Sequence, residues 1–382
     1  MESNTTLVET GAAAPGLLGL PVDILVLLPE YLHDIEDYMN VALTCRRFRK
    51  LMDTALPHTI LCLASRSANL FFRPSPHFLV CAVARQIGDW ARKSRENEAE
   101  LAAGMPRGID HLMDLALSKE QFGLTIEDIR RLYELRSSVV DPVSGLMGKA
   151  AKSGAWSDCG VHIRAIDTFF HLAIYGELFG PDFEPFLDHD YCHEPVLRVE
   201  TRLEFIKYCI PEHGAVSFDD ALDKTLPDGS VDPRRVVAIH PDGPYARDEQ
   251  GRLPSMFNNM GGLLCLFRSI HWRPYLLNAR LEAGAGWDYF YDPKSRWRQR
   301  ILDNIMMCQG LEGLGMILSG TDIAEKWKPK IKAWKAQINA LEEEPASTGA
   351  GAARAREYPD LLGELCICLY YCPAAIRFLP SG

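Results

Sequence analysis

Hydrophobic and polar positions follow a helical period along most of the chain, and the densest apolar stretch lies near its start. In residues 19–32 one set of apolar side chains recurs every three or four positions, as on one face of a helix: Leu20, Ile24, Leu27, Leu28, Tyr31 and Leu32. Val22, Leu25 and Val26 make the opposite side of that helix apolar as well. Because a segment of about 35 residues is too short to enclose a core of its own, we interpret this stretch as half of an interface.

Proline and capping signals divide the stretch into short helices. Pro21 suits a first helical turn, whereas Pro29 has no N–H to donate to residue 25 and is expected to kink or end the first helix. Asp34, with Asp37 three positions later, predicts the N-cap of a second helix that runs to Met52. The apolar stripe of this second helix comprises Tyr38, Val41, Ala42, Cys45, Phe48 and Met52, and its basic end comprises Arg46, Arg47, Arg49 and Lys50.

These residues resemble an F-box. The resemblance is carried by Leu20-Pro21-Val22-Asp23-Ile24, by Tyr31-Leu32 and by Leu43-Thr44-Cys45-Arg46-Arg47-Phe48-Arg49-Lys50-Leu51. In that family a small cluster of three helices docks onto a Skp-type adaptor, which links it to a cullin-RING ubiquitin ligase, while the rest of the chain presents a protein substrate. The resemblance therefore implies the substrate-recognition subunit of a Skp/cullin/F-box ligase, which is not itself an enzyme and needs no cofactor.

The family pattern also implies which residues meet the adaptor. They are Leu20, Pro21, Ile24, Leu28 and Leu32 in the first half of the motif, and Cys45, Arg46 and Phe48 in the second half. Two departures, Pro29 and the tight link His33-Asp34, bear on the angle between the first helices. The alternative is that the apolar face packs against the rest of this chain.

Helical spacing continues through most of the remaining residues, so we predict a mainly α protein in which the F-box precedes an irregular α-helical body. The expected parts are a disordered tail at 1–15, the F-box at 16–56, a helical body at 57–344 with a long loop near 210–258, a linker at 345–357 and a docking helix at 358–382. Within the body we expect one long helix from Leu79 to Ala103, a capping box at Thr125, either a helix or a strand from Val199 to Cys209, and an N-cap at Thr321. Gly145 to Lys149 resembles a phosphate loop only superficially, and we interpret it as a turn.

Composition excludes several classes of partner and compartment. The formal net charge of −10 opposes general binding to nucleic acid or to an anionic membrane surface. Eleven cysteines without C-x-x-C pairs indicate free or buried thiols, which fits the cytoplasm or the nucleus. We also find no segment with the pattern of a secretion signal or a membrane span.

Two clusters could carry chemistry. The densest group of potential metal ligands comprises Asp188, His189, Asp190, Cys192, His193 and Glu194. Its alternative interpretation is a solvated polar loop, which we favour because Pro185 and Pro195 leave little room for a helix. We therefore expect no metal, but a helical metal-assisted hydrolase using Asp188, His189, His193 and Glu194 stays open. Cys366, Cys368 and Cys372 are interpreted as core thiols.

Arginines interleaved with aromatic residues form a candidate substrate-binding patch. Its members are Arg268, Trp272, Arg273, Arg296, Trp297 and Arg298. Such side chains suit acidic or phosphorylated peptides, although we favour the alternative that the aromatics are core residues with the arginines at their solvated edge. The segments Gly123 to Leu132 and Gly310 to Leu314 are similar to those of filamentous-fungal F-box proteins, a similarity that names no substrate. A non-ligase F-box scaffold is the remaining alternative.

Overall fold

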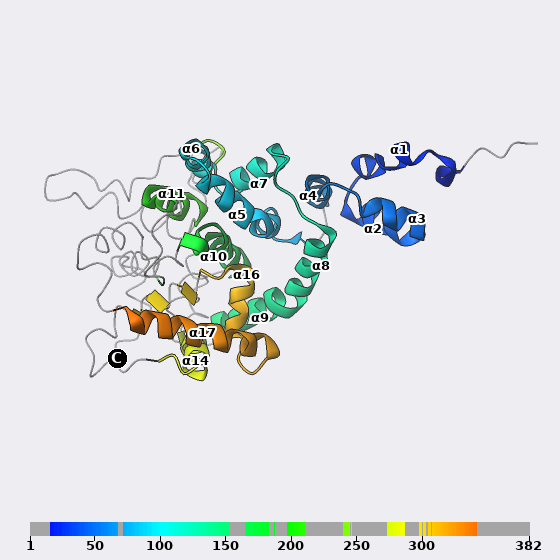
Figure 1. The fold of residues 1–382 in the computed structure, drawn as a ribbon. Helices are drawn as coiled ribbons and strands as arrows, with labels where there is room; N and C mark the ends of the chain where they lie inside the picture. The colour runs from blue at the N-terminus through cyan, green and yellow to red at the C-terminus, as the bar shows by residue number, and fades with distance from the viewer. Residues whose placement is uncertain are drawn as a thin grey trace, which may run out of the picture. The chain divides into compact units, whose positions relative to one another are not determined.

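The computed structural model describes residues 16–67, 72–152, 165–182, 187, 197–210, 240–244, 246, 273–286, 298–299, 301–302, 305–306 and 308–341. The chain divides into two compact units, Met1–Ala68 and Asn69–Gly382, here called the first unit and the body. The elements are helices throughout the described residues, which contain no strand (Figure 1). The mainly α prediction is confirmed.

The first unit is built from very short helices. Its elements are η1 (Leu17–Gly19), α1 (Val22–Leu25), η2 (Leu28–Tyr31), α2 (Ile35–Thr44), α3 (Arg46–Met52) and α4 (Pro57–Arg66). Helix α1 ends before Pro29, which lies in the first turn of η2. The predicted break at Pro29 is confirmed, and it limits α1 to about one turn.

The predicted second helix begins correctly but does not reach Met52. Asp34 is the N-cap of α2, and its Oδ1 accepts a hydrogen bond from the backbone N–H of Asp37 at 2.9 Å. Cys45 then takes an extended conformation (φ −157°, ψ 163°) and separates α2 from α3. The Thr44 hydroxyl donates to the carbonyl oxygen of Val41 at 2.7 Å, and bonds of this kind compete with helix continuation. The expectation of one helix over this stripe was therefore wrong.

The core of the first unit includes residues of α4. Its buried hydrophobic side chains are Leu25, Ile35, Tyr38, Phe48, Leu51, Met52, Ile60, Leu61, Leu63 and Ala64. The Tyr38 hydroxyl joins α2 to α3 by donating to the carbonyl oxygen of Met52. Pro57 is the first residue of α4, a position that proline favours. The compact unit therefore continues past residue 56, where we expected the F-box to end, as far as Ala68.

The body contains the longer helices. They are α5 (His77–Arg92), α6 (Arg95–Gly104), η4 (Met105–Arg107), α7 (Ile109–Ser118), α8 (Ile126–Leu135), the π-helical η5 (Arg136–Val140), α9 (Asp141–Lys152), α10 (Ala165–Phe179), α11 (Val199–Cys209), α14 (Arg273–Glu282), α16 (Gly310–Gly313), η8 (Leu314–Ile317) and α17 (Asp322–Ala340). The long helix expected from Leu79 to Ala103 is interrupted, because the extended Ser94 caps α6 by accepting from the backbone N–H of Asn97 at 3.1 Å.

Helices α5 and α10 form the centre of the body, where they lie side by side (Figure 1). Aromatic rings of the two helices pack against each other, with the centroids of Phe78 and Phe170 5.2 Å apart in an edge-to-face arrangement. Gly88 permits a close approach, since a Cβ at this position would stand 2.6 Å from the carbonyl oxygen of Leu178. These contacts hold α5 against α10, and other helices of the body pack around the two.

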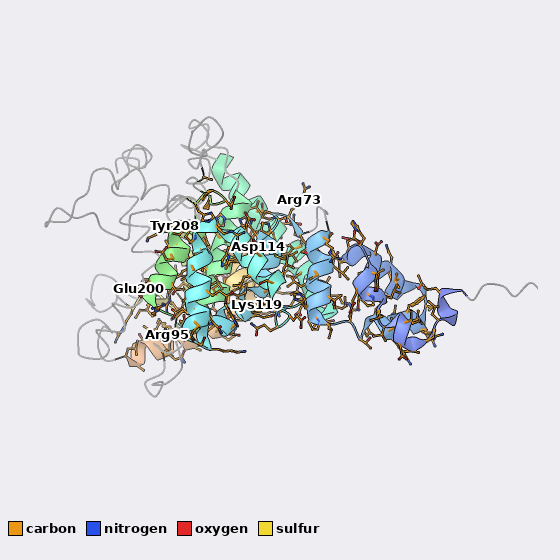
Figure 2. The ribbon with its side chains drawn as sticks, turned by 90° about the horizontal axis from the view of Figure 1, so that it is seen from above. Arg73, Arg95, Asp114, Lys119, Glu200 and Tyr208 are labelled. Carbon is orange, nitrogen blue, oxygen red and sulfur yellow. The ribbon has the colours of Figure 1, made fainter. Side chains whose placement is uncertain are left out.

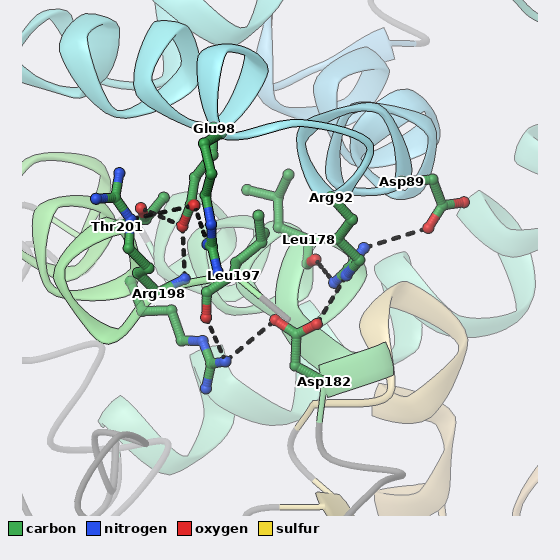
Figure 3. Close-up of polar contacts among 10 residues, drawn as sticks. Asp89, Arg92, Glu98, Leu178, Asp182, Leu197, Arg198 and Thr201 are labelled. Atoms are coloured by element: carbon green, nitrogen blue, oxygen red, sulfur yellow. Dashed lines mark hydrogen bonds and ion pairs between the residues drawn. The ribbon is translucent and has the colours of Figure 1, made fainter. Parts of the chain in front are cut away.

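Two buried carboxylates connect the helices around this pair (Figure 3). Asp182, which follows α10, accepts from Nε of Arg92 on α5 at 2.7 Å and from Nη2 of Arg202 on α11 at 3.2 Å. Glu98 on α6 accepts from the backbone N–H of Arg198 at 2.5 Å and from the Thr201 hydroxyl at 2.9 Å. Both carboxylates are only 1% exposed, so charged hydrogen bonds replace the water that each has lost.

Together, the hydrogen bonds to Glu98 affect its pKa more strongly than its burial does. Burial alone would raise the pKa of this carboxyl, but the backbone N–H of Arg198 and the side chains of Arg95, Thr201 and Arg198 hold the pKa below its ordinary value. Nη1 of Arg95 lies 2.6 Å from Glu98 Oε2. The carboxylate therefore stays charged and ties the start of α11 to α6.

Other local predictions for the body have mixed outcomes. Thr125 forms the expected capping box with Asp128, and Thr321 caps α17 by accepting from the backbone N–H of Ala324 at 3.3 Å. The ambiguous segment Val199 to Cys209 is the helix α11. The interpretation of Gly145 to Lys149 as a turn was wrong, because these residues lie within α9.

Several predicted segments lie outside the described residues. They are the tail at 1–15, the linker at 345–357, the helix at 358–382 and most of the loop near 210–258. Of that loop, the described turn at 240–244 packs against η4, since a Cβ at Gly243 would stand 2.3 Å from the carbonyl oxygen of Pro106. Among the described helices none has the length and hydropathy needed to cross a membrane.

Candidate functional site

Exposed large hydrophobic side chains gather in the first unit. Nine such side chains occur among the described residues, and the only one in the body is Leu281. The other eight, here called the apolar set, are Leu17, Val22, Ile24, Val26, Leu27, Tyr31, Leu43 and Leu56. Soluble proteins rarely concentrate exposed apolar surface in this way unless it binds a partner, so this unit contains the candidate functional site.

The shortness of α1 explains why the apolar set is exposed. Within residues 22–31 the unit buries only Leu25 and Pro29, since a single helical turn can direct few side chains inward. Ile24 is 52% exposed and Tyr31 79% exposed. Five members of the apolar set therefore lie within one stretch of ten residues, and two of them directly flank the buried Leu25.

The predicted adaptor contacts fall into three groups by exposure. Pro21, Ile24 and Arg46 are exposed, and Leu20, Leu28, Leu32 and Cys45 are half-buried. Phe48 is only 7% exposed, which places it in the core of the unit between exposed arginines. Direct contact of Phe48 with a partner is not supported by this position, and the roles of the other residues stay predictions.

The apolar set contains residues that our prediction of the site omitted. They are Leu17, Val22, Val26, Leu27, Tyr31, Leu43 and Leu56. A signal for part of this group was present in the sequence, because Pro21 and Pro29 confine the first helix and both of its sides are apolar. Such a helix cannot bury both sides, whichever side faces the core.

Charged residues accompany the apolar set. Arg46, Arg47, Arg49 and Lys50 are exposed on α3, and Asp23 and Glu30 are exposed in α1 and η2. Nη2 of Arg47 lies 3.5 Å from the carbonyl oxygen of Leu20, which brings α3 close to the start of α1. The unit thus offers apolar side chains with a basic helix nearby, a composition suited to a partner that is apolar with acidic edges.

Comparison with known protein families identifies this unit. A family described as F-box-like matches residues 17–62. The chain carries an F-box-like domain. The F-box match begins at the first member of the apolar set and ends within α4, so it covers all eight members and extends beyond the end at residue 56 that we expected.

Two further comparisons, with curated proteins and with solved structures, found no similar protein. The similarity to filamentous-fungal F-box proteins therefore stays a prediction, and the body has no counterpart from which a substrate can be inferred.

Most of the predicted substrate-binding patch lies outside the described residues. Arg268, Trp272, Arg296 and Trp297 lie there, and Arg273 is the first residue of α14. Arg298 is half-buried and its Nη2 lies 3.1 Å from the carbonyl oxygen of Leu341 and 3.5 Å from that of Asn339. This arginine therefore contacts carbonyl groups at the C-terminal end of α17, and the substrate-binding role of the patch stays a prediction.

Candidate metal ligands cannot be assembled from the described part of the chain. Asp188, His189, Asp190, Cys192, His193 and Glu194 lie outside it, as do Cys366, Cys368 and Cys372. Among the described residues no three histidine, cysteine, aspartate or glutamate side chains stand close enough together to hold a metal ion. The described cysteines Cys45, Cys62, Cys81, Cys209 and Cys308 are free thiols.

Proposed function

We propose that this protein is the substrate-recognition adaptor of a Skp/cullin/F-box ubiquitin ligase. Its F-box would bind a Skp-type adaptor and through it a cullin, and its body would hold a protein substrate in the cytoplasm or nucleus. The observation that carries this proposal is that, among the described residues, eight of the nine exposed large hydrophobic side chains lie in the F-box. The proposal assigns no catalysis, cofactor, nucleic-acid or membrane partner to this chain.

The apolar set would supply part of the free energy of such a complex. Fully burying one large exposed apolar side chain contributes about 1.5–3 kcal/mol. The five members within residues 22–31 are on average about half exposed, so burying the rest of their surface would contribute about 4–8 kcal/mol. Association itself costs about 4–15 kcal/mol, so the other members of the apolar set and the basic residues of α3 would be needed for tight binding.

Co-expression with a Skp-type adaptor tests the proposal. Wild-type protein is expected to elute from gel filtration as a one-to-one complex. Ile24→Asp combined with Tyr31→Asp should weaken binding by at least about 30-fold, because both substitutions place a charge where an apolar contact is needed. Leu281→Asp is the matched control, since Leu281 is 54% exposed and Ile24 is 52% exposed, but Leu281 lies in the body.

Folding of each variant can be checked separately from binding. The first of the seven tryptophans is Trp90, so all of them lie in the body and tryptophan fluorescence reports on the body alone. Circular dichroism of the F-box helices completes the check. Folded wild-type protein that forms no complex would refute the adaptor proposal, as would equal binding by the double variant.

The ligase role and the scaffold alternative predict different lifetimes for the proteins that the body captures while the adaptor is bound. A ligase subunit shortens the lifetime of proteins that its body captures, whereas a scaffold leaves it unchanged. Proteins crosslinked to the body can therefore be followed after a block of synthesis, with and without Ile24→Asp/Tyr31→Asp. Stabilisation of captured proteins by the double variant supports the ligase role, and unchanged lifetimes support the scaffold.

A further inference from the structure

A pair of histidines lies at the joint between α5 and α10. His77 is the first residue of α5, and His171 lies within α10. Their Nε2 atoms are 3.0 Å apart, and their ring centroids are 4.9 Å apart. His171 is buried and His77 partly buried, and each directly adjoins one ring of the Phe78–Phe170 pair in sequence. The two imidazoles therefore meet in the part of the body where water is scarce.

The distance between the two nitrogens limits how many protons the pair can hold. At 3.0 Å one Nε2–H donates to the bare Nε2 of the other ring. Two neutral imidazoles satisfy this arrangement, because each has one N–H and one bare nitrogen. A proton added to one ring can leave this hydrogen bond in place, whereas protons on both rings set two N–H groups against each other. Protonation of both rings is therefore unfavourable while the joint is closed.

The charges described around His77 do not favour its protonation. Burial lowers the pKa of His77 to about 3, with the charge of His171 acting in the same direction and a backbone contact with Ser75 opposing both. No carboxylate of the described residues contributes to that shift. Charged side chains on α5, on α10 and on the elements packed against them are paired with one another, among them Arg85 with Glu177, Arg136 with Asp141, and Arg131 with Glu312.

We propose that His77 and His171 form a proton-sensitive lock on the α5–α10 joint, closed while His77 is neutral and opened when both rings are protonated. The lock is independent of the adaptor role, since it lies in the body. In the unfolded chain histidine titrates near pH 6.5, so the unfolded state binds the proton first as the pH falls. The stabilisation is fully present above about pH 6.5 and is lost progressively as the pH falls towards about 3.

A pH series of unfolding measurements tests the lock. The full chain is unfolded by urea between pH 7.5 and pH 4.5 in the presence of EDTA, and tryptophan fluorescence follows the body. His77→Gln keeps a side chain that can both donate and accept a hydrogen bond but cannot titrate. Between pH 5.5 and 4.5 the unfolding equilibrium constant of the wild type should rise about tenfold more than that of His77→Gln, the effect of one proton.

His240→Gln is the control, because His240 lies in the turn outside the helices and should leave the wild-type pH dependence unchanged. Equal pH dependence in wild type and His77→Gln would overturn the proposal. If His77→Gln does not fold, nitrogen-15 spectra of the wild-type imidazoles decide the question. A neutral His77 ring at pH 5 supports the lock, and a charged His77 ring at that pH refutes it.

Discussion

The F-box and the body distribute apolar and charged side chains in opposite ways. The F-box leaves the eight members of the apolar set exposed, whereas Leu281 is the only exposed large hydrophobic side chain among the described residues of the body. The body instead buries two carboxylates among arginines. It also pairs charges at its surface, as between Lys119 and Glu100 at 3.0 Å and between Arg107 and Asp114. Figure 2 labels one member of each pair, Lys119 and Asp114.

The contrast indicates that the body supplies most of the folding stability and that the apolar set supplies the free energy of binding. A cluster of helices as short as α1 and α3 cannot bury all its apolar side chains, so part of its surface remains available to a partner. The longer helices of the body enclose a core and fix one another through buried ion pairs. Substitutions in the body should therefore act on folding, and substitutions in the apolar set should act on binding.

The largest expected effect is the loss of a buried carboxylate from the body. Asp182→Ala leaves Arg92 and the buried Arg202 without their shared counter-ion. Removing one partner of a buried ion pair costs about 3–5 kcal/mol, so urea unfolding followed by tryptophan fluorescence should shift accordingly. The matched control is Asp89→Ala, because Asp89 binds the same arginine at 3.2 Å but is 59% exposed. The control should cost at most about 1 kcal/mol, and equal losses for both variants would contradict the comparison.

A second prediction applies the contrast to two neighbouring residues of the F-box. Leu25 is buried and Ile24 is exposed, although both belong to the four-residue α1. Leu25→Ala should lower the free energy of unfolding of the F-box by about 2–5 kcal/mol, whereas Ile24→Ala should change it by about 0.5 kcal/mol or less. Amide hydrogen exchange in α2 and α3 measures the stability of the F-box without interference from the body.

Adaptor affinity should change in the reverse order. When the two variants are compared under conditions where both are folded, Ile24→Ala should weaken the adaptor complex about tenfold or more, as expected for a contact worth about 1.4 kcal/mol. Leu25→Ala should weaken it less, because Leu25 has no exposed surface to offer. The opposite ranking would mean that the buried side of α1 meets the adaptor after a rearrangement of the unit.

The sequence predicts those features of the fold that depend on neighbouring residues. Asp34, Thr125 and Thr321 cap helices as expected, because a capping side chain needs only a backbone N–H about three positions away. Pro29 ends α1 for an equally local reason, since it has no N–H to give. The class of fold follows from many such local preferences acting in the same direction.

Features that depend on distant residues could not be predicted in this way. The sequence shows that Phe48 and Ile24 are apolar, but only the packing of α2, α3 and α4 decides that one is buried and the other exposed. The contact of Arg298 with the carbonyl oxygen of Leu341 joins residues 43 positions apart, and the sequence pattern around Arg298 gives no sign of it. The breaks at Cys45 and Ser94 interrupt regular apolar stripes, and periodicity alone cannot reveal them.

The smallest expected effect comes from an ion pair on the surface of the body. Arg130 and Glu127 lie one turn apart on α8, with Nη1 of Arg130 3.1 Å from Oε2 of Glu127, and both side chains are exposed to water. Arg130→Ala should change the free energy of unfolding of the body by about 0.5 kcal/mol or less, because solvent already screens the pair. Urea unfolding at low and at high salt provides the measurement, and the small difference should diminish further in high salt. A loss close to that of Asp182→Ala would mean that burial does not determine how strongly the charged pairs stabilise the body.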